Sequence, residues 1–376
     1  MVAMSRTILA LNSGSSSLKA SLFRADGTRS TWHYEHIGNG FPHDHAEAFD
    51  ALLKDLGRET PDAIGHRFVH GGDVGEAARL LDDAEIERLR GIVPLAPLHL
   101  PGNLFGVELC RSRFDVPQVA CFDTAFHHDL PAPARRLPIP DELGMRRYGF
   151  HGLNYAYVAS RLPSLLGEAA HGRVAVAHLG AGASLCLLHD LKSVDTTMGY
   201  SPAGGIPMGT RSGDLDPGVM LELSRRYDHA ALSDLVYHRM GLLALSGGES
   251  SEMRTLLASR SEAADFAVEY FCAGVRAAIG AFTAKAGGID ALVFSGGIGE
   301  HAPEIRSRIC GPLGFLGFVL DPDANLANRT RIDASGAQPV LRIAADEETV
   351  IRDLVEVLPA RPSPGRRSSH GAIRGR

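Results

Sequence analysis

Cysteine is sparse in this chain and is never arranged in close pairs. The five cysteines of the 376-residue sequence are dispersed, and none forms a CxxC spacing. This scarcity argues against a disulfide framework and against a zinc site, because both use cysteines at recurring short spacings. We therefore expect reduced thiols in the core of a cytoplasmic protein. The cysteines are Cys110, Cys121, Cys186, Cys272 and Cys310.

Long apolar runs and clustered basic residues are also missing. No stretch approaches the roughly 18 apolar residues of a membrane span, and the first apolar run is too short for a signal peptide. The formal net charge is -6 and no basic face is concentrated in the sequence, which argues against a nucleic-acid footprint. We expect neither a membrane nor a nucleic-acid partner.

Length and glycine are what the chain has in abundance. A chain of 376 residues exceeds the size at which one hydrophobic core usually keeps growing, so two domains with a cleft between them are expected. The 42 glycines are typical of loops in which the backbone approaches a ligand closely.

Two hairpins with small polar tips have the same layout. Residues 7–23, "TILALNSGSSSLKASLF", and residues 173–190, "RVAVAHLGAGASLCLLHD", each join two apolar strands through a tip of small residues. The first lacks the GxxxxGK[ST] pattern of a P-loop, but such a tip can take phosphate. The alternative is a plain surface hairpin. The repetition predicts a duplicated αβ domain, each copy extending one tip into a shared cleft.

A third glycine-rich segment follows a buried strand. The sequence "ALVFSGGIGEHAPEIRSRI" leads from an apolar run at 291–294 into a loop with three glycines, and then into a helix with Pro303 near its first turn. Helix N-termini attract anions. Three such segments together indicate a cleft for a nucleotide phosphate chain.

Four reactive residues stand in apolar or glycine-rich surroundings, where charge is costly. Arg67 and Arg211 can grip a phosphoryl group with planar guanidinium forks, although each can instead form a structural ion pair. Asp123 ends an apolar run, where it can orient a nucleophile or a metal, or only cap a turn. His151 can donate to the transferring group, or be a buried histidine satisfied by a carbonyl.

Two histidine pairs could in principle bind a metal ion, but the sequence around them argues against a metal site. His66 and His70 have a helical zinc spacing, but the following glycines and the β-branched residues oppose a helix, and the glutamate of HExxH is missing. His127 and His128 are expected in a surface turn rather than as a ligand pair.

Taken together, these stretches resemble acetate kinase, of the superfamily of sugar kinases, actin and heat-shock chaperone ATPases. The resemblance runs from Ile8 to Leu358. It rests on "LNSGSSSLK", "HRFVHGG", "PLAPLH", "FDTAFHHDLP", "RRYGFHG", "HLGAG", "PMGTRSGDLDPG", "FSGGIGEHAPEIR" and "ADEE", in the family's order. It implies an α/β fold of two duplicated actin-like, ribonuclease H-like domains with an interdomain cleft.

The resemblance also implies roles for individual residues. Arg67 and Arg211 would bind the phosphoryl group, Asp123 would position acetate, and His151 would bond the transition state. Asn12 and Glu347 would help to hold Mg2+, or possible Mn2+, on the phosphate chain. The implied pocket for the acetate methyl group consists of Val69, Leu98, Phe150 and Pro202, next to Arg67. The implied nucleotide-binding residues are Lys19, His178, Gly180, Gly182, Glu252, Met253, Arg254, Gly296, Gly297 and Gly299.

The chain departs from the family pattern at several places, including "PLHLPGN" in place of "PLHNPPN" and a shorter segment before Gly65. Ala181 replaces a usual asparagine in "HLGAG", so one side-chain contact to nucleotide phosphate should be missing. Tyr155 stands in place of a second histidine, and Glu252 replaces an aspartate. None of these changes removes a residue assigned to phosphoryl transfer.

The expected domains are residues 1–125 with 348–359, and residues 126–347 with the nucleotide site, followed by a disordered tail at 360–376. Helices are expected over 82–93, 228–243 and 262–288.

The implied reaction is direct, in-line and reversible transfer of the γ-phosphoryl of ATP to acetate, which gives acetyl phosphate and ADP. The alternatives are a propionate or other short-chain acyl kinase, or an actin-like nucleotide switch without kinase activity. The family further implies a homodimer through the second domain.

Overall fold

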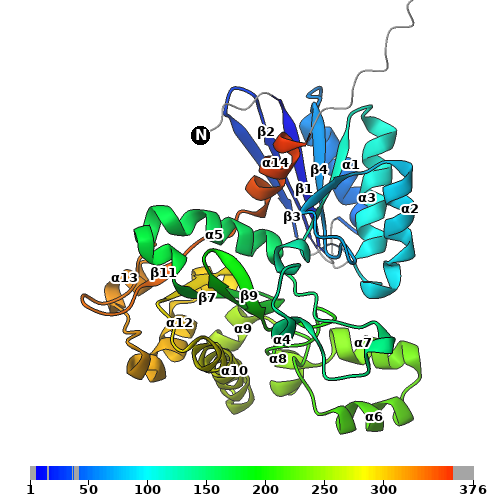
Figure 1. Cartoon of the computed structure of the whole chain (residues 1–376). Coiled ribbons are helices and arrows are strands. Elements are labelled where there is room, and N and C mark those ends of the chain that lie inside the picture. The colour runs from blue at the N-terminus through cyan, green and yellow to red at the C-terminus, as the bar shows by residue number, and fades with distance from the viewer. Residues whose placement is uncertain (1–5, 15–16, 36, 38–41, 359–376) are drawn as a thin grey trace, which may run out of the picture.

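The computed structural model describes residues 6–14, 17–35, 37 and 42–358. Ser15 and Ser16 of the first hairpin tip, residue 359 of the first expected domain and the tail at 360–376 lie outside the described residues. Within that description the chain forms two β-sheets, one in each half of the molecule, and each sheet is covered by helices (Figure 1).

The first sheet has the strand order β3-β2-β1-β4-β6-β5. Its first three strands form an antiparallel meander, and β4 and β6 then run parallel to β1. Its members are β1 (Ile8–Ser13), β2 (Leu18–Phe23), β3 (Arg29–Tyr34), β4 (Ala63–Phe68), β5 (Ala78–Leu80) and β6 (Gln118–Phe122).

The second sheet repeats this arrangement with the order β11-β10-β7-β8-β9. The strands β7, β8 and β9 again form an antiparallel meander, and β10 and β11 continue in parallel. Its members are β7 (Arg173–Leu179), β8 (Ala183–His189), β9 (Lys192–Thr196), β10 (Ala291–Ser295) and β11 (Val340–Arg342). The shared topology confirms the predicted duplication and the actin-like α/β fold.

Helices pack on both faces of the first sheet. Alternate residues of each strand point to opposite sides, so each strand contributes to both cores. On one face, Leu9 and Leu11 pack with α1 (His45–Leu56) and α3 (Leu100–Arg113). On the other face, Ile8 and Ala10 pack with Ile351 of α14 (Glu347–Val357). The last described helix therefore returns to the first half of the chain, as Figure 1 shows in red.

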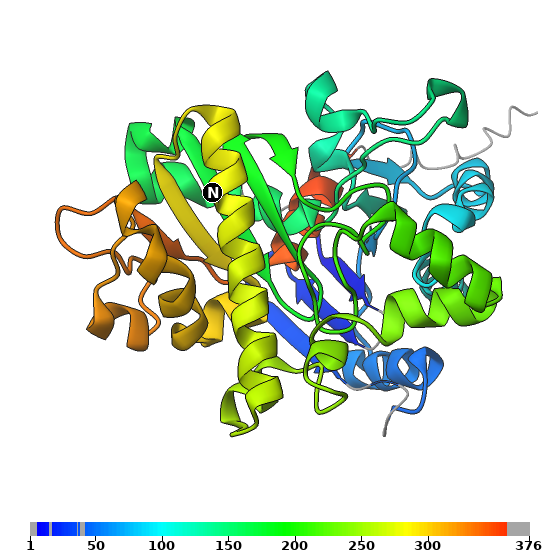
Figure 2. The ribbon, with the colours of Figure 1, turned by 90° about the horizontal axis from the view of Figure 1, so that it is seen from below.

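The helix α5 (Gly152–Leu166) lies between the two halves. Its Leu153 packs with the first sheet, and its Val158 packs with Val174 and Val176 of the second. The opposite face of the second sheet is covered by α10 (Glu262–Ala286), the long yellow helix of Figure 2. Helix α5 therefore packs against both halves of the molecule.

The remaining helices are shorter. They are α2 (Asp83–Gly91), α4 (Ala132–Arg135), α6 (Pro217–Arg226), α7 (His229–His238), α8 (Gly241–Leu245), α9 (Met253–Ala258), α11 (Gly296–His301), α12 (Pro303–Cys310) and α13 (Pro322–Leu326), with short 3-10 turns at Val93–Leu95, Ala125–His127, Asp141–Leu143, Gly167–His171 and Gly311–Leu316.

Two of the expected elements differ from the sequence prediction. The single helix expected over 228–243 is two helices, α7 and α8, because Gly241 adopts a left-handed φ of 64° and its backbone packs on Met208 and Arg211. The glycine loop expected after β10 is instead the short helix α11, which begins at Gly296 directly after the strand.

Helix α10 matches the expected helix over 262–288 and ends at Gly287, whose φ is 71°. By length and hydropathy alone it also qualifies as a membrane-spanning helix, which the sequence analysis did not anticipate. Its buried residues, among them Phe271 and Val275, are part of the core against the second sheet. The helix is therefore accounted for as a core element of this fold.

Candidate active site between the two halves

Arg67 and Asp123 form a buried pair at the carboxyl ends of β4 and β6. Asp123 is fully buried, and its Oδ2 accepts from Nε and Nη2 of Arg67 at 3.0 and 2.5 Å. Burial raises the pKa of Asp123 to about 6, although Arg67 opposes the shift. Burial also works to lower the pKa of Arg67, but Asp123 and Glu347 outweigh it and raise that pKa above its usual value. The guanidinium therefore stays charged.

A second acidic group lies on the other side of Arg67. The side-chain amide of Asn12, at the end of β1, donates to Glu347 at 2.7 Å and to Glu348 at 3.2 Å. Its carbonyl oxygen accepts from Nη1 of Arg67 at 3.3 Å. Oε2 of Glu347 lies 3.6 Å from Nε of Arg67. Sequence reasoning assigned Asn12 and Glu347 but missed Glu348, although it is the last acid of "ADEE".

The donor set around Asn12 suits a hard divalent cation. Burial and the charge of Glu347 raise the pKa of Glu348, and Oε2 of Glu348 also lies 3.7 Å from Nη2 of Arg29. Within the described chain no group of three His, Cys, Asp or Glu side chains is arranged to hold a metal ion. Mg2+ typically takes one or two carboxylates from the protein and the rest from substrate phosphates and water. Asn12 and Glu347 fit that pattern.

Arg211 is brought to the same cleft from the second half. Its loop is held by backbone hydrogen bonds from Met240 to Thr210 and from Leu242 to Met208, at 2.9 and 2.8 Å. Nη1 donates to the carbonyl of Pro202 at 2.7 Å. Among the described residues Arg211 has no carboxylate partner, and burial lowers its pKa. The alternative of a structural ion pair therefore does not hold for Arg211.

His151 lies between the two arginines. It begins α5 with a left-handed φ of 58°, and a Cβ on the following Gly152 would overlap the carbonyl of Asp123. Its ring stacks on His178 at 4.0 Å. Burial lowers the pKa of His151 well below its usual value, helped by the charges of His178, Arg67 and Arg211. The ring is therefore a neutral donor rather than a cation at neutral pH.

The second hairpin tip lies against this group. A Cβ on Gly182 would lie 3.2 Å from Nη2 of Arg211 and 3.5 Å from Nε2 of His151, so only glycine leaves that space open. On the opposite tip, Lys19 pairs across the hairpin with Asn12. Its charge contributes to the pKa of His178 and of Glu348.

The glycines of α11 lie beside the second tip. Gly296 has a φ of 75°, and a Cβ there would lie 2.7 Å from the carbonyl oxygen of Leu179, at the end of β7. Nothing lies within 4 Å of a Cβ on Gly297, so the backbone is open there. Gly299 lies close to Phe294 of β10, while a Cβ on Gly180 would approach the backbone of Gly182.

The start of α9 borders the same tip. The amide of Gly209 donates to the carbonyl of Ala181 at 3.1 Å, and a Cβ on Gly209 would lie 3.0 Å from the carbonyl of Ser251. The residues predicted near adenosine follow directly; Glu252 and Arg254 are exposed, whereas Met253 is buried in the core.

The apolar residues predicted to hold the methyl group are not all equally enclosed. Val69 and Phe150 are buried in the same apolar cluster, and Pro202 is buried and bonded to Arg211. Leu98 is 41% exposed. It precedes His99, whose pKa is lowered by burial and by the charges of Arg67 and Arg211 to about 4.

Sequence reasoning missed three residues that support this site. Asn154 donates to Nδ1 of His178 at 2.8 Å and to Ser295 at 3.2 Å. Ser184 lies 2.9 Å from Nδ1 of His151. Tyr155, noted only as a departure from the family pattern, bonds Ser184. In the sequence, the only indication of a role for these three residues is that each lies within a few positions of a motif residue.

The histidine pairs do not form a metal site. His66 bonds Gln118 at 2.8 Å inside the first sheet, and Nδ1 of His70 accepts from the amide of Gly72 at 2.9 Å. The expectation that His127 lies in a surface turn is wrong. His127 is fully buried and bonds Ser193 and the carbonyl of Phe150, because the turn is covered by β9.

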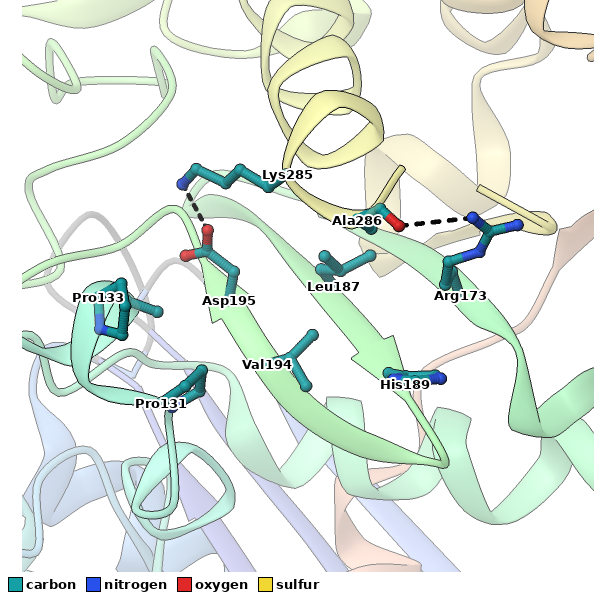
Figure 3. Close-up of a pocket in the computed structure, with 10 residues that line it drawn as sticks. Pro131, Pro133, Arg173, Leu187, His189, Val194, Asp195, Lys285 and Ala286 are labelled. Atoms are coloured by element: carbon teal, nitrogen blue, oxygen red, sulfur yellow. Dashed lines mark hydrogen bonds and ion pairs between the residues drawn. The ribbon is translucent and has the colours of Figure 1, made fainter. Parts of the chain in front are cut away.

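A cavity of about 460 Å³ lies away from all these residues, between α4, α10 and the outer strands of the second sheet (Figure 3). Lys285 at its rim is paired with Asp195 at 2.5 Å, and Arg173 donates to the carbonyl of Ala286. None of the predicted site residues lines it, and its cations are already partnered. The group of predicted residues around Arg67, Arg211 and His151 is therefore the candidate active site.

Comparisons with known proteins identify the family of this chain. The acetokinase family matches residues 38–353. The chain is 43% identical to an acetate kinase of Rhodopseudomonas palustris over 389 residues, which cover 93% of this chain and 97% of that protein. The crystal structure of a Francisella tularensis propionate kinase has the same fold, with a TM-score of 0.83 and 32% identity over 93% of this chain and 98% of that one. The crystal structure of Porphyromonas gingivalis acetate kinase also shares the fold, with a TM-score of 0.77 and 31% identity over 92% of this chain and 98% of that one. The chain belongs to the acetokinase family and is a phosphotransferase with the actin-like fold.

Proposed function

We propose that this protein transfers the γ-phosphoryl group of ATP to acetate, reversibly and in line, giving acetyl phosphate and ADP. The observation that carries this proposal is the position of Arg211, a partly buried guanidinium without a carboxylate partner among the described residues, facing the same histidines as Arg67. A guanidinium without a counter-ion fits a site whose anion arrives with the substrate.

Each reactive side chain has a distinct task in this mechanism. Arg67 and Arg211 stabilise the charge that spreads over the equatorial oxygens of the transferring phosphoryl group. Asp123 holds Arg67 in place and positions acetate. His151, which is neutral, donates a hydrogen bond to a phosphoryl oxygen. A carboxylate nucleophile is already ionised at neutral pH, so no general base is needed.

Asn12 and Glu347 would hold Mg2+, or possibly Mn2+, against the phosphate chain. Bound there, the ion would neutralise charge on the phosphate oxygens. Lys19 lies beside it and adds positive charge. The support is the side-chain amide of Asn12, which bonds the carboxylates of both Glu347 and Glu348.

The nucleotide would lie along the second half of the cleft. The open backbones of Gly182 and Gly297 support an approach of the phosphate chain, with His178 beneath it. The remaining glycines and the start of α9 would border the phosphates and adenosine; these residues are Gly180, Gly296, Gly299, Glu252, Met253 and Arg254.

The acyl pocket supports acetate and also keeps propionate as a second candidate. Val69 and Phe150, which are buried in one apolar cluster, would line the pocket, whereas Leu98 is 41% exposed and would enclose it less tightly. One methylene in an apolar pocket changes discrimination by only about 1–3 kcal/mol. The Francisella tularensis relative is titled a propionate kinase.

We also propose that the protein is a cytoplasmic homodimer. The helices α6 and α7 have no fully buried residue. Large apolar side chains are exposed around α6, namely Leu215, Val219, Leu221 and Tyr227. A self-complementary contact would cover them. The five cysteines are all buried and free, which suits a reducing compartment.

The domain boundaries that we propose follow the two sheets. The first domain would comprise residues 1–125 and 348–359, and the second residues 126–347. The support is that β1 to β6 belong to one sheet, β7 to β11 to the other, and α14 packs on the first.

A single assay tests this function. Purified protein is incubated with ATP, magnesium and acetate, propionate or butyrate, and acyl phosphate is trapped with hydroxylamine. We expect acetate-dependent acyl hydroxamate together with ADP. ATP hydrolysis that is indifferent to every carboxylate would instead identify a nucleotide switch and reject the proposal.

A further inference from the structure

A chain of two hydroxyl groups lies behind His151, on the side away from the cleft. The hydroxyl of Tyr155 lies 2.6 Å from Oγ of Ser184, and that Oγ lies 2.9 Å from Nδ1 of His151. Tyr155 and Ser184 are both fully buried. Tyr155 follows His151 by one turn of α5, whereas Ser184 comes from β8 of the second sheet.

The protons of this chain have one favoured direction. Among the described residues the hydroxyl of Tyr155 has one side-chain hydrogen-bond partner, Oγ of Ser184 at 2.6 Å. The phenol proton is then left for Ser184, and the proton of Ser184 is left for Nδ1 of His151. The reverse direction would leave the phenol proton without an acceptor among the described residues, in a fully buried place where an unmade hydrogen bond is costly.

The consequence lies on the other nitrogen of His151. A neutral imidazole that accepts at Nδ1 carries its proton on Nε2. Nε2 faces the cleft, 3.5 Å from where a Cβ on Gly182 would stand and close to Nη2 of Arg211. The proton is therefore on the nitrogen that faces the proposed place of the transferring group.

The ring of Tyr155 is held in place by neighbouring aromatic side chains. Its ring stacks on Phe126, with centroids 6.5 Å apart, and meets the edge of His127 at 5.6 Å. Nε2 of His127 in turn bonds the carbonyl of Phe150, the residue before His151, at 3.0 Å. Tyr155 and the backbone of His151 are thus fixed by the same buried cluster.

We infer that Tyr155 is a positioning residue, whose hydroxyl acts through Ser184 to keep the Nε2–H tautomer of His151 directed at the transferring phosphoryl group. This inference rests on the proposed function for the identity of that group. The tautomer of His151 can nevertheless be measured without turnover.

The kinetic test compares Tyr155→Phe with Tyr157→Phe. Tyr157 lies two residues further along α5, and its hydroxyl has no hydrogen-bond partner in the described part of the chain. We expect Tyr155→Phe to lower kcat about tenfold or more, with the KM values for acetate and ATP changed less than about twofold, and Tyr157→Phe to behave as wild type. Ser184→Ala removes the same chain from its middle and should reproduce the effect.

A double variant separates positioning from general damage. If Tyr155 acts through His151, then Tyr155→Phe has no further effect on kcat in a His151→Ala background. Equal multiplicative losses in both backgrounds, or a wild-type kcat in Tyr155→Phe, would overturn the inference.

The spectroscopic test uses 15N-labelled histidine and assigns His151 by its loss in His151→Ala. We expect an unprotonated Nδ1 and a protonated Nε2 in the wild type, and a mixture of tautomers in Tyr155→Phe. A protonated Nδ1 in the wild type would reject the inference whether or not the protein makes acyl phosphate. Absence of acyl phosphate with the expected tautomer would reject only the proposed reaction.

Discussion

Nη2 of Arg67 lies 2.5 Å from Oδ2 of the fully buried Asp123, across the neighbouring parallel strands β4 and β6. The register sets Arg67 opposite Cys121, two residues before Asp123. Both side chains therefore reach the same end of the sheet, where parallel-sheet enzymes place their active residues. The pair gives Arg67 one fixed orientation, while Arg211 from the other half has no such acid among the residues that the structure describes.

Replacing Arg211 by alanine should reduce kcat about 10³-fold, because a positively charged group at the transferring phosphoryl is lost. The measurement is acyl hydroxamate formation at saturating ATP and acetate. Arg225→Ala on α6, where the arginine is paired only with Glu222, should leave the rate unchanged. If Arg211→Ala keeps more than about a tenth of the wild-type rate, the assigned role is wrong.

Activity should fall on acidification through pH 6. Burial raises the pKa of Asp123 to about 6, so the carboxylate is ionised and bonded to Arg67 above that pH and becomes protonated below it. The kcat/KM for acetate should then lose up to about tenfold per pH unit on the acid side. Circular dichroism at each pH checks that the fold persists. A flat profile to about pH 5, with the fold intact, would contradict this pKa.

Shortening Val69 should shift the enzyme toward longer acids. Val69 is buried in the pocket proposed for the methyl group, and Val69→Ala makes room for one more methylene. The ratio of kcat/KM for propionate over acetate should rise about tenfold. Val107→Ala makes the same change in the core of the first half and should leave that ratio unchanged. An unchanged ratio in Val69→Ala would remove Val69 from the pocket.

An asparagine at position 181 should tighten ATP binding. Ala181 is exposed at the second hairpin tip, with its carbonyl held by Gly209, so a longer side chain has room there. One added hydrogen bond contributes about 0.5–1.5 kcal/mol. Ala181→Asn should therefore lower the KM for ATP several-fold without changing kcat. Ala181→Val, which adds bulk without an amide, should not. Equal effects of the two changes would argue against a phosphate contact.

Adding one methyl group at Gly65 should destabilise the fold. A Cβ there would overlap the side chains of Ile351 and Val355 on α14, and such overpacking costs about 1–3 kcal/mol. Urea unfolding of Gly65→Ala should show that loss. At Gly91, the last residue of α2, a Cβ meets nothing within 4 Å. Gly91→Ala should therefore be neutral or stabilising. Similar midpoints for both variants would contradict the close packing of α14 on β4.

Much of the fold was accessible from local patterns. The alternation after Ser17 predicted β2. The paired glycines at 287–288 predicted the end of α10, because a glycine can adopt the left-handed conformation that ends a helix whatever the rest of the fold. The break at Gly241 was not accessible, since nothing near it in the sequence indicates that its backbone must pack on the Arg211 loop. The burial of His127 was missed for the same reason, because β9 covers it from more than sixty residues away.

By itself the sequence determined the two similar hairpins, their small-residue tips and the buried strand before the third glycine segment, since periodicity and turn chemistry are properties of neighbouring residues. Only the tertiary structure decided that Arg67 and Arg211 face one cleft, that Arg211 lacks an acidic partner there, and that Tyr155 reaches His151 through Ser184. Those relationships join residues of different elements. The distances and orientations between such residues are set only when the two sheets and α5 pack together, so the sequence alone does not show them.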